Sequence, residues 1–142
     1  MILPDVNLLL YAVDVESARH PQARKWLEGV LSGTEEVGLA WAVVLGFVRI
    51  STNPNIFEEP LDPARAFTYV EEWIGRPVAV TLAPGSGHVA LVKELLQDLG
   101  AAGNLTSDAH LAALAIEHGA ELCSSDTDFA RFKGLRWRDP IS

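Results

Sequence analysis

The stretch NLTSDAHLAALAIEHGAELCSSDTDF, residues 104–129, decides the fold of this chain because it joins a helix to a strand and then to acids. Apolar residues recur at helical spacing from Asp108 to His118, which predicts an amphipathic helix. Thr106 or Ser107 is its expected N-cap, and Gly119 is its expected end. The short apolar run that follows is typical of a buried strand in a parallel sheet.

The same alternation of strands and helices extends from this stretch toward both ends of the chain. Short apolar runs predict the strands, and apolar residues three or four apart predict the helices. We therefore expect an α/β fold with a mainly parallel central sheet and helices on both faces. The expected strands are Ile2–Val6, Glu36–Ala40, Val78–Leu82, Glu121–Ser124 and Leu135–Arg138, and the other expected helices are Asn7–Val13, His20–Leu31, Trp41–Ile50, Pro63–Trp73 and His88–Leu99.

The composition suits one domain that spans residues 1–142. With 49% hydrophobic residues, a chain of 142 residues buries a core without disulfides. The one cysteine, Cys123, excludes an internal disulfide and a Cys-cluster zinc site, which fits a reducing compartment. The start shows no signal-peptide pattern, and the apolar stretch Val37–Val48 is shorter than the roughly 20 residues of a membrane span. We therefore expect a cytoplasmic protein that makes no membrane contact.

Four aspartates lie where one shared pocket can form. Asp5 follows the first strand, Asp108 opens a helix, and Asp126 and Asp128 follow a later strand. Because the carboxyl ends of parallel strands meet at one edge of a sheet, we expect these side chains to lie together. Packed carboxylates repel one another unless a divalent cation neutralises them. The four acids therefore predict a Mg²⁺ site, in which Mn²⁺ is also acceptable.

Each of these acids also has a purely structural explanation. Asp5 suits the N-cap of the next helix, Asp108 suits the positive end of a helix dipole, and Asp126 suits the start of a turn. Taken singly, the structural explanations are favoured, and only the joint position of the acids favours a metal site.

The net charge of -8 argues against nucleic-acid binding driven by overall charge. A bound cation could still attract nucleic acid locally, and so could four basic residues near the C-terminus, Arg131, Lys133, Arg136 and Arg138. A solvated charged surface explains these four residues equally well. Arg49 is a further candidate for an RNA phosphate contact, but the C-terminal turn of a helix attracts a basic residue for electrostatic reasons alone.

Three stretches of the chain resemble the PIN-domain ribonucleases and, within that family, the VapC-type toxins of toxin–antitoxin pairs. They are DVNLLLYAVD (residues 5–14), LAWAVVLGFVRISTNP (39–54) and GNLTSDAHLAALAIEHGAELCSSDTDFARFKGLRW (103–137), and the resemblance covers nearly the whole chain. It implies a PIN-like three-layer α/β/α sandwich and a metal-dependent endoribonuclease that hydrolyses RNA. It also implies a homodimer that a small antitoxin protein holds inactive.

The resemblance assigns roles to individual residues. Asp5, Asp108 and Asp126 match catalytic, metal-binding acids, and Asp128 is close enough to Asp126 to assist as a ligand. The polar positions that support the site in the family are matched by Asn7 and Ser124.

One position departs from the family pattern. Many members carry a glutamate at the start of the central helix, where this chain has Gly46, aligned by the Phe47, Val48 and Arg49 that follow. The missing acid puts the second of two metal ions in question. It also keeps open the alternative of a catalytically weakened PIN-fold module that binds RNA or a protein.

The histidines show no separate catalytic motif. His110 lies two residues after Asp108, so a helix turns it away from that acid, and a structural role is favoured. His20, His88 and His118 are scattered without metal-ligand spacing.

The apolar content and the positive mean hydropathy favour association with partners. Besides a homodimer, we expect a groove lined by Trp26, Trp41 or Phe47 that accepts an amphipathic antitoxin helix. A phospho-acceptor signalling domain also gathers acids around magnesium, but the late lysine of this chain, Lys133, follows no strand.

Overall fold

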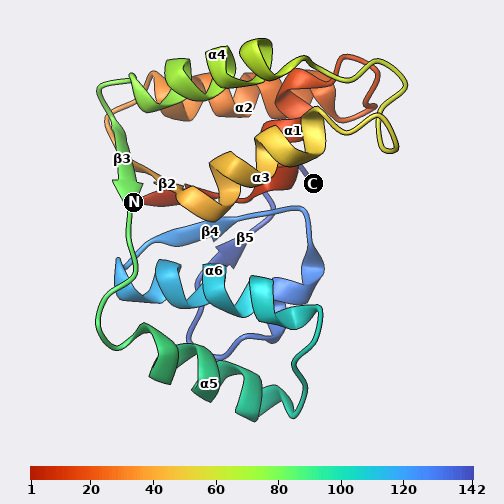
Figure 1. The fold of residues 1–142 in the computed structure, drawn as a ribbon. Coiled ribbons are helices and arrows are strands. Elements are labelled where there is room, and N and C mark those ends of the chain that lie inside the picture. The colour runs from red at the N-terminus through yellow and green to blue at the C-terminus, as the bar shows by residue number, and fades with distance from the viewer.

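A wholly parallel sheet of five strands forms the centre of the molecule (Figure 1). The structure is a computed structural model that describes residues 1–142. Its strands are β1 (Ile2–Pro4), β2 (Val37–Ala40), β3 (Ala79–Leu82), β4 (Glu121–Cys123) and β5 (Trp137–Arg138). They stand in the order β3-β2-β1-β4-β5, so the first strand lies in the middle.

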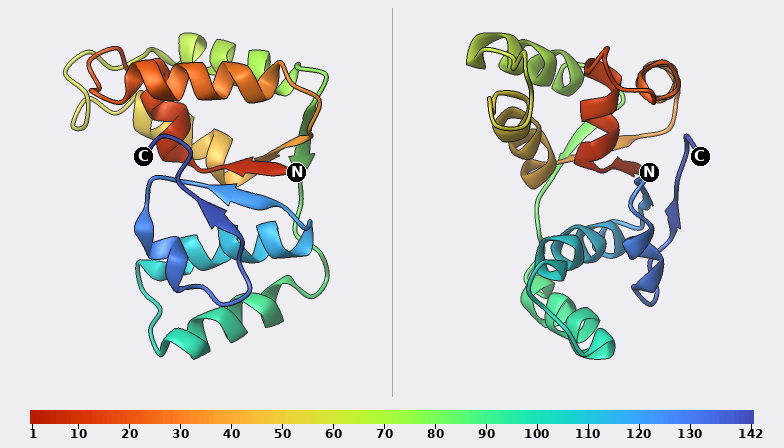
Figure 2. Two further views of the ribbon diagram at one scale, coloured as in Figure 1. Left: turned by 180° about the vertical axis from the view of Figure 1, so that it is seen from behind. Right: turned by 90° about the vertical axis from the view of Figure 1, so that its right-hand side faces the viewer.

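Six α-helices cover the two faces of this sheet. They are α1 (Val6–Val13), α2 (His20–Leu31), α3 (Trp41–Ser51), α4 (Pro63–Ile74), α5 (His88–Leu99) and α6 (Leu105–Glu117), and a 3₁₀ helix (Thr127–Arg131) follows β4. Helices α1 to α4 lie on one side, whereas α5 and α6 pack together on the other (Figures 1 and 2). The predicted three-layer α/β/α fold with a parallel sheet is therefore confirmed. None of the helices combines the length and the apolar character needed to cross a membrane.

The central strands are apolar throughout because helices cover both of their faces. Every residue of β1 and β2 is buried, as are Leu122 and Cys123 of β4. On the larger helical side, the fully buried Phe47 meets Trp73 edge-on with their ring centroids 4.8 Å apart. This aromatic contact packs α3 against α4.

Two helix starts position acids at the carboxyl edge of the sheet. Asp5 accepts a hydrogen bond from the backbone N–H of Val6 and so caps α1. Helix α6 begins at Leu105, so the prediction of Thr106 or Ser107 as its N-cap was wrong. The left-handed Gly103 (φ 60°) turns the chain early enough for the helix to start there. Asp108 consequently lies within the first turn of α6.

Candidate metal centre

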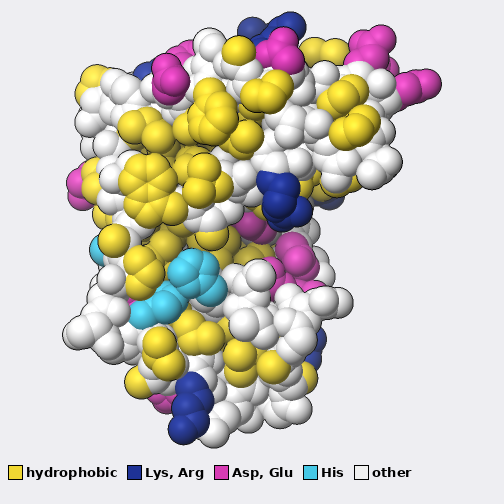
Figure 3. Space-filling view, viewed as in Figure 1, with side chains coloured by type: hydrophobic (Ala, Val, Ile, Leu, Met, Phe, Trp, Pro, Cys, Tyr) yellow, Lys and Arg dark blue, Asp and Glu magenta, His cyan; other side chains and the backbone are white.

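Three aspartates converge beside the C-terminal end of β4 and the N-terminal end of α6. Carboxylate oxygens of Asp108, Asp126 and Asp128 all lie within 4.8 Å of one another. Asp108 comes from the first turn of α6, whereas the other two begin the 3₁₀ helix. Figure 3 shows acidic side chains in a hollow between the upper helices and α6. The structure thus brings together residues that are up to 20 positions apart in the sequence.

Local hydrogen bonds orient two of these acids. Asp126 accepts the backbone N–H of Asp128 at 2.9 Å, which starts the 3₁₀ helix. The backbone N–H of Asp126 in turn donates to the hydroxyl of Ser124 at 3.0 Å. The structural explanation for Asp126, a turn start, is therefore correct, and it holds together with membership of the acidic group.

The predicted fourth acid, Asp5, lies beside this group and contacts it through a serine. One carboxylate oxygen of Asp5 accepts the N–H of Val6 at 2.7 Å, and the other accepts the hydroxyl of Ser124 at 2.7 Å. Asn7 donates its side-chain N–H to the same hydroxyl oxygen at 3.1 Å. The fully buried Ser124 therefore joins β1 and α1 to the 3₁₀ helix.

Proximity of like charges and partial burial perturb two of the acids. The pKa of Asp108 rises to about 6 because of burial and the charges of Asp126, Asp5 and Asp128. Burial also raises the pKa of Asp5, against the opposing effects of its hydrogen bonds from Ser124 and Val6. A bound cation would reverse the electrostatic part of both shifts.

The polar atoms around the acids fit a hard divalent cation. The Oδ1 atom of Asn7 is buried and has no hydrogen-bond partner in the protein. The orientation of this amide follows from the network, because Ser124 gives its only proton to Asp5 and so accepts from the Nδ2 of Asn7. A set of carboxylate and amide oxygens is what Mg²⁺ and Mn²⁺ prefer.

Gly46, the position of the missing family acid, lies in α3 against the start of α1. A Cβ atom built there would meet the Cγ2 of Val6 at 3.7 Å, an ordinary van der Waals distance. Val6 directly follows Asp5, so this part of α3 lies near the candidate centre. A side chain at residue 46 is therefore sterically acceptable, and the glycine removes an acid without being required by packing.

The predicted RNA-contacting arginines are exposed. Arg49 lies in the last turn of α3 and Arg131 in the last turn of the 3₁₀ helix, and neither forms an ion pair. By contrast, Arg136 donates to the carbonyl of Gly119, and Arg138 pairs with Glu121 at 3.1 Å. The C-terminal basic run is thus partly occupied by structural contacts.

Of the three aromatic residues named as alternatives for a groove, one, Phe47, lines a cavity in the structure. Phe47 is core, Trp26 is half-buried on α2, and Trp41 is exposed on α3, so the three do not share one surface. A cavity of about 630 Å³ lies instead between the ends of α1 and α3, the loop 52–62 and the start of α4, with Phe47 in its floor. Periodicity predicts which residues are apolar, but it does not predict which helices leave a gap between them.

Sequence reasoning missed a second polar cluster, formed by His88, His110 and Glu117. His88 lacks metal-ligand spacing in the sequence, but in the structure its ring contacts both other residues. One signal was available, since His110 and Glu117 are seven residues apart and so share one face of α6. Burial and the neighbouring His88 lower the pKa of His110.

The domain belongs to the wholly parallel α/β/α class and groups its carboxylates at the ends of the strands, where ligands bind in folds of this class. The sequence profile of the PIN domain matches residues 2–135, and the chain belongs to the PIN-domain family.

Curated relatives of nearly equal length carry ribonuclease names. Ribonuclease VapC37 of Mycobacterium tuberculosis is 44% identical over 140 residues, which cover 99% of this chain and 97% of the relative. Ribonuclease VapC33 of the same species is 44% identical over 141 residues, or 99% of both chains.

Solved structures share the fold at low sequence identity. VapBC-1 from nontypeable Haemophilus influenzae superposes with a TM-score of 0.69 and 17% identity, with both chains fully covered. FitAB bound to a DNA fragment gives a TM-score of 0.67 and 16% identity. These likenesses confirm the predicted PIN-like architecture.

Proposed function

We propose that this chain is a VapC-type endoribonuclease toxin that hydrolyses RNA phosphodiester bonds with a divalent metal and is inhibited by a cognate antitoxin. The observation that carries the proposal is the group of three carboxylates within 4.8 Å of one another, in a PIN domain whose 44% identical relatives are named ribonucleases. We also propose that it acts in the cytoplasm, where RNA and an antitoxin are available.

The cation would be held by Asp108, Asp126 and Asp128, and the carboxylate of Asp5 would lie beside them. A Mg²⁺ or Mn²⁺ ion supplies Lewis-acid stabilisation of the phosphate and promotes deprotonation of the attacking water. The protein's own contribution is positional: Ser124 donates to Asp5 and accepts from the N–H of Asp126, which fixes the two acids relative to each other. Asn7 leaves its free Oδ1 as a further oxygen beside them.

RNA would approach as a flexible strand along the exposed surface beside the acids. The net charge of -8 argues against binding driven by overall charge, so phosphate contacts would come from a few local residues. Arg49 and Arg131 are both exposed and free of ion pairs, and we propose them for this role.

A cleavage assay with metal replacement tests the proposal. Purified protein would be incubated with a structured RNA pool in Mg²⁺, Mn²⁺ or chelator, beside Asp108→Asn and Asp126→Asn. The matched control is Asp98→Asn, because Asp98 is exposed on α5 and forms no ion pair. We expect cuts that need metal, persist in the control and disappear in both site variants. Absence of cleavage in every metal by folded protein would overturn the proposal.

Gly46 is the observation that favours a second candidate, a weakened module that only binds RNA or a protein. If the chain cleaves RNA weakly, Gly46→Glu should raise the rate, since the position has room for a side chain. Gly46→Gln is the matched control because it has the same shape without the charge. RNA binding that survives Asp5→Asn, with no cleavage in the parent protein, would favour the binding module instead.

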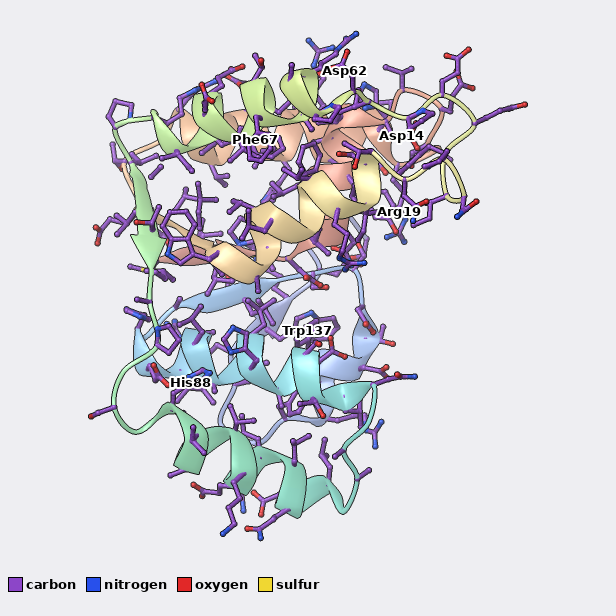
Figure 4. The ribbon with its side chains drawn as sticks, viewed as in Figure 1. Asp14, Arg19, Asp62, Phe67, His88 and Trp137 are labelled. Carbon is purple, nitrogen blue, oxygen red and sulfur yellow. The ribbon has the colours of Figure 1, made fainter.

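We place the antitoxin in the cavity beside α1, α3 and α4. Apolar residues line it together with one base, Arg65, and four acids, so that its lining is net negative (Figure 4 labels Asp14); the acids are Asp14, Glu16, Glu58 and Glu59. An amphipathic antitoxin segment with basic residues would match both features. Ile56→Asp should weaken binding of the antitoxin measured by calorimetry, whereas Phe67→Asp, outside the cavity, should not.

The homodimer remains a proposal that rests on exposed apolar side chains. Trp41 and Leu45 lie one turn apart on α3, and both are about half exposed. Leu45→Lys should shift the sedimentation coefficient toward the monomer, whereas Val15→Lys, at an exposed position between α1 and α2, should leave it unchanged. A monomeric parent protein at micromolar concentration would contradict the dimer.

A further inference from the structure

The cluster of His88, His110 and Glu117 lies on the α5–α6 side of the sheet, outside the acidic group. His88 opens α5, whereas the other two lie on one face of α6 (Figure 4 labels His88). Figure 3 shows histidine side chains at the surface on this face of the molecule. The His88 side chain is 12% exposed and that of Glu117 17% exposed.

Hydrogen bonds determine which nitrogen of His88 carries a proton. Its Nδ1 lies 2.5 Å from Oε1 of Glu117, and a carboxylate can only accept, so the proton is on Nδ1. The second oxygen of Glu117 accepts the backbone N–H of Gly85 at 2.8 Å, which holds the carboxylate in place. The Nε2 of His88 therefore carries a lone pair in a neutral ring.

That lone pair faces a second imidazole nitrogen. The Nδ1 of His110 lies 2.7 Å from the Nε2 of His88, and the two rings meet edge-on. A carboxylate that accepts one ring N–H while the other nitrogen points to a shared position is the arrangement that orients metal-ligating histidines. When both rings are neutral and no metal is bound, His110 donates its Nδ1 proton to the Nε2 of His88.

We propose that the Nε2 of His88 and the Nδ1 of His110 bind a borderline transition-metal ion such as Zn²⁺, with Glu117 as the outer carboxylate. Imidazole nitrogens select such ions over Mg²⁺, and water would fill the remaining coordination positions. The proton on the Nδ1 of His110 moves to its own Nε2 through solvent, so both rings stay neutral and no net proton is released. Rotation of His110 would widen the nitrogen separation to about 3.3 Å, as bonds of about 2.0 Å at tetrahedral angles require.

This site is separate from the acidic group. His110 follows Asp108 by two positions on α6, and a helix turns about 100° per residue, so their side chains point in nearly opposite directions. A bound ion would link the start of α5 to the middle of α6. Its expected effect is therefore to stabilise the α5–α6 pair, whether or not the chain cleaves RNA.

Zinc titration in excess Mg²⁺ tests the inference, because Mg²⁺ occupies oxygen sites and leaves the histidines free. Competition with a chromophoric zinc chelator should give one Zn²⁺ per chain, with affinity at least about 10-fold weaker in His88→Ala and His110→Ala. Glu117→Gln should weaken binding by about 10-fold, the lower end for loss of an outer carboxylate. The matched control is His118→Gln, an exposed histidine bound only to the carbonyl of Ala83.

A direct readout covers the case in which an alanine variant unfolds. Zinc should shift the imidazole ¹⁵N resonances of His88 and His110 in the unaltered protein and leave those of His20 and His118 in place. Equal loss of zinc in His118→Gln, or shifts spread over all four histidines, would mean surface binding and overturn the proposal. Neither measurement depends on RNA cleavage, so failure here leaves the proposed nuclease function unaffected.

Discussion

Helix α6 carries two polar clusters that differ in how their charges are balanced. At its start, Asp108 meets Asp126 and Asp128, and burial together with the charges of these acids and of Asp5 raises the pKa of Asp108 to about 6. Toward its end, Glu117 accepts two hydrogen bonds, and His88 links it to His110. The first cluster lacks a positive partner within the protein, whereas the second satisfies itself. Grouped carboxylates are electrostatically incomplete without a cation, whereas the imidazole pair is neutral with or without the ion that we propose for it.

The largest expected effect comes from removing one charge of the incomplete cluster. Asp126→Asn should reduce metal-dependent RNA cleavage by about 100-fold or more, since even outer partners of a metal site contribute 10–100-fold. Initial rates in saturating Mg²⁺ would measure this. Glu117→Gln alters the cluster near the other end of α6 and should change the rate of RNA cleavage little. A similar loss in both variants would contradict the separation of the two clusters.

The next effect concerns the serine that joins the acids. Ser124→Ala leaves a buried carboxylate oxygen of Asp5, the amide of Asn7 and the N–H of Asp126 without their partner. We expect the free energy of unfolding to fall by about 2–3 kcal/mol, the cost of unsatisfied buried polar groups. Urea denaturation would measure it. Ser125→Ala should cost much less, because its only side-chain bond is a long one of 3.4 Å to Asp139.

The free energy of unfolding should fall by a smaller amount when the carboxylate of the His88, His110 and Glu117 cluster is neutralised. Glu117→Gln keeps the shape but weakens the bonds from Gly85 and His88, and we expect a loss of about 1–2 kcal/mol at pH 7. Hydrogen exchange of α5 amides should report the change more strongly than that of α3 amides. An equal change in hydrogen exchange of α5 and α3 amides would show that the cluster does not specifically stabilise α5.

The incomplete cluster should also respond to pH. The folded pKa of Asp108, about 6, lies above its ordinary value of 3.8, so protonation favours the folded chain. In chelator, this contribution is fully present below about pH 4 and is lost as pH rises through about 6. Asp108→Asn should therefore stabilise the metal-free protein at pH 7, by about 1 kcal/mol after allowance for solvent screening. Thermal unfolding of both proteins from pH 4 to 7.5 would measure it, and a constant difference would contradict it.

Binding of Mg²⁺ should follow the same titration with the opposite sign. The cation competes with the proton on Asp108, so affinity should rise with pH until about 6 and then level off. Calorimetric titration at several pH values gives the midpoint. An affinity independent of pH would mean that Asp108 is not a ligand.

The smallest expected effect is a change in stability at residue 46, where the family acid is missing. Gly46→Ala should stabilise the protein by about 0.5–1 kcal/mol, because glycine is a poor helix former and the new Cβ meets Val6 without a clash. The metal affinity should stay unchanged, since no oxygen is added. Destabilisation measured in urea would indicate that α3 and α1 are packed more closely than 3.7 Å implies.

Local features of the fold were predictable because they depend on neighbouring residues. The period of apolar residues predicted α3, which ends at Ser51 instead of the expected Ile50. The start of α4 is equally local, since Asp62 caps the helix by accepting the N–H of Arg65. The start of α6 was wrong by three residues, since the conformation of Gly103 and not a hydroxyl cap decides it.

Contacts between distant segments were less predictable. The joint position of the acids was expected from parallel strand ends, and three of the four meet as a group. Of the residues Trp26, Trp41 or Phe47 that were expected to line a groove, Phe47 lines the observed cavity, and helix packing places the two tryptophans elsewhere. The pairing of His88 with His110 depends on how α5 docks against α6, which no local pattern encodes.

The sequence by itself determined the succession of strands and helices along the chain, their apolar faces and the identity of the acids. Periodicity and turn chemistry act over a few residues, so these features are local. Tertiary structure alone decided that Ser124 joins Asp5 to Asp126, across 119 positions for the first contact. That contact exists because β1 lies beside β4, with Pro4 opposite Cys123 in the register. Strand order in the sheet is a property of the whole packed domain, and it places the acids close enough for their charges to repel one another.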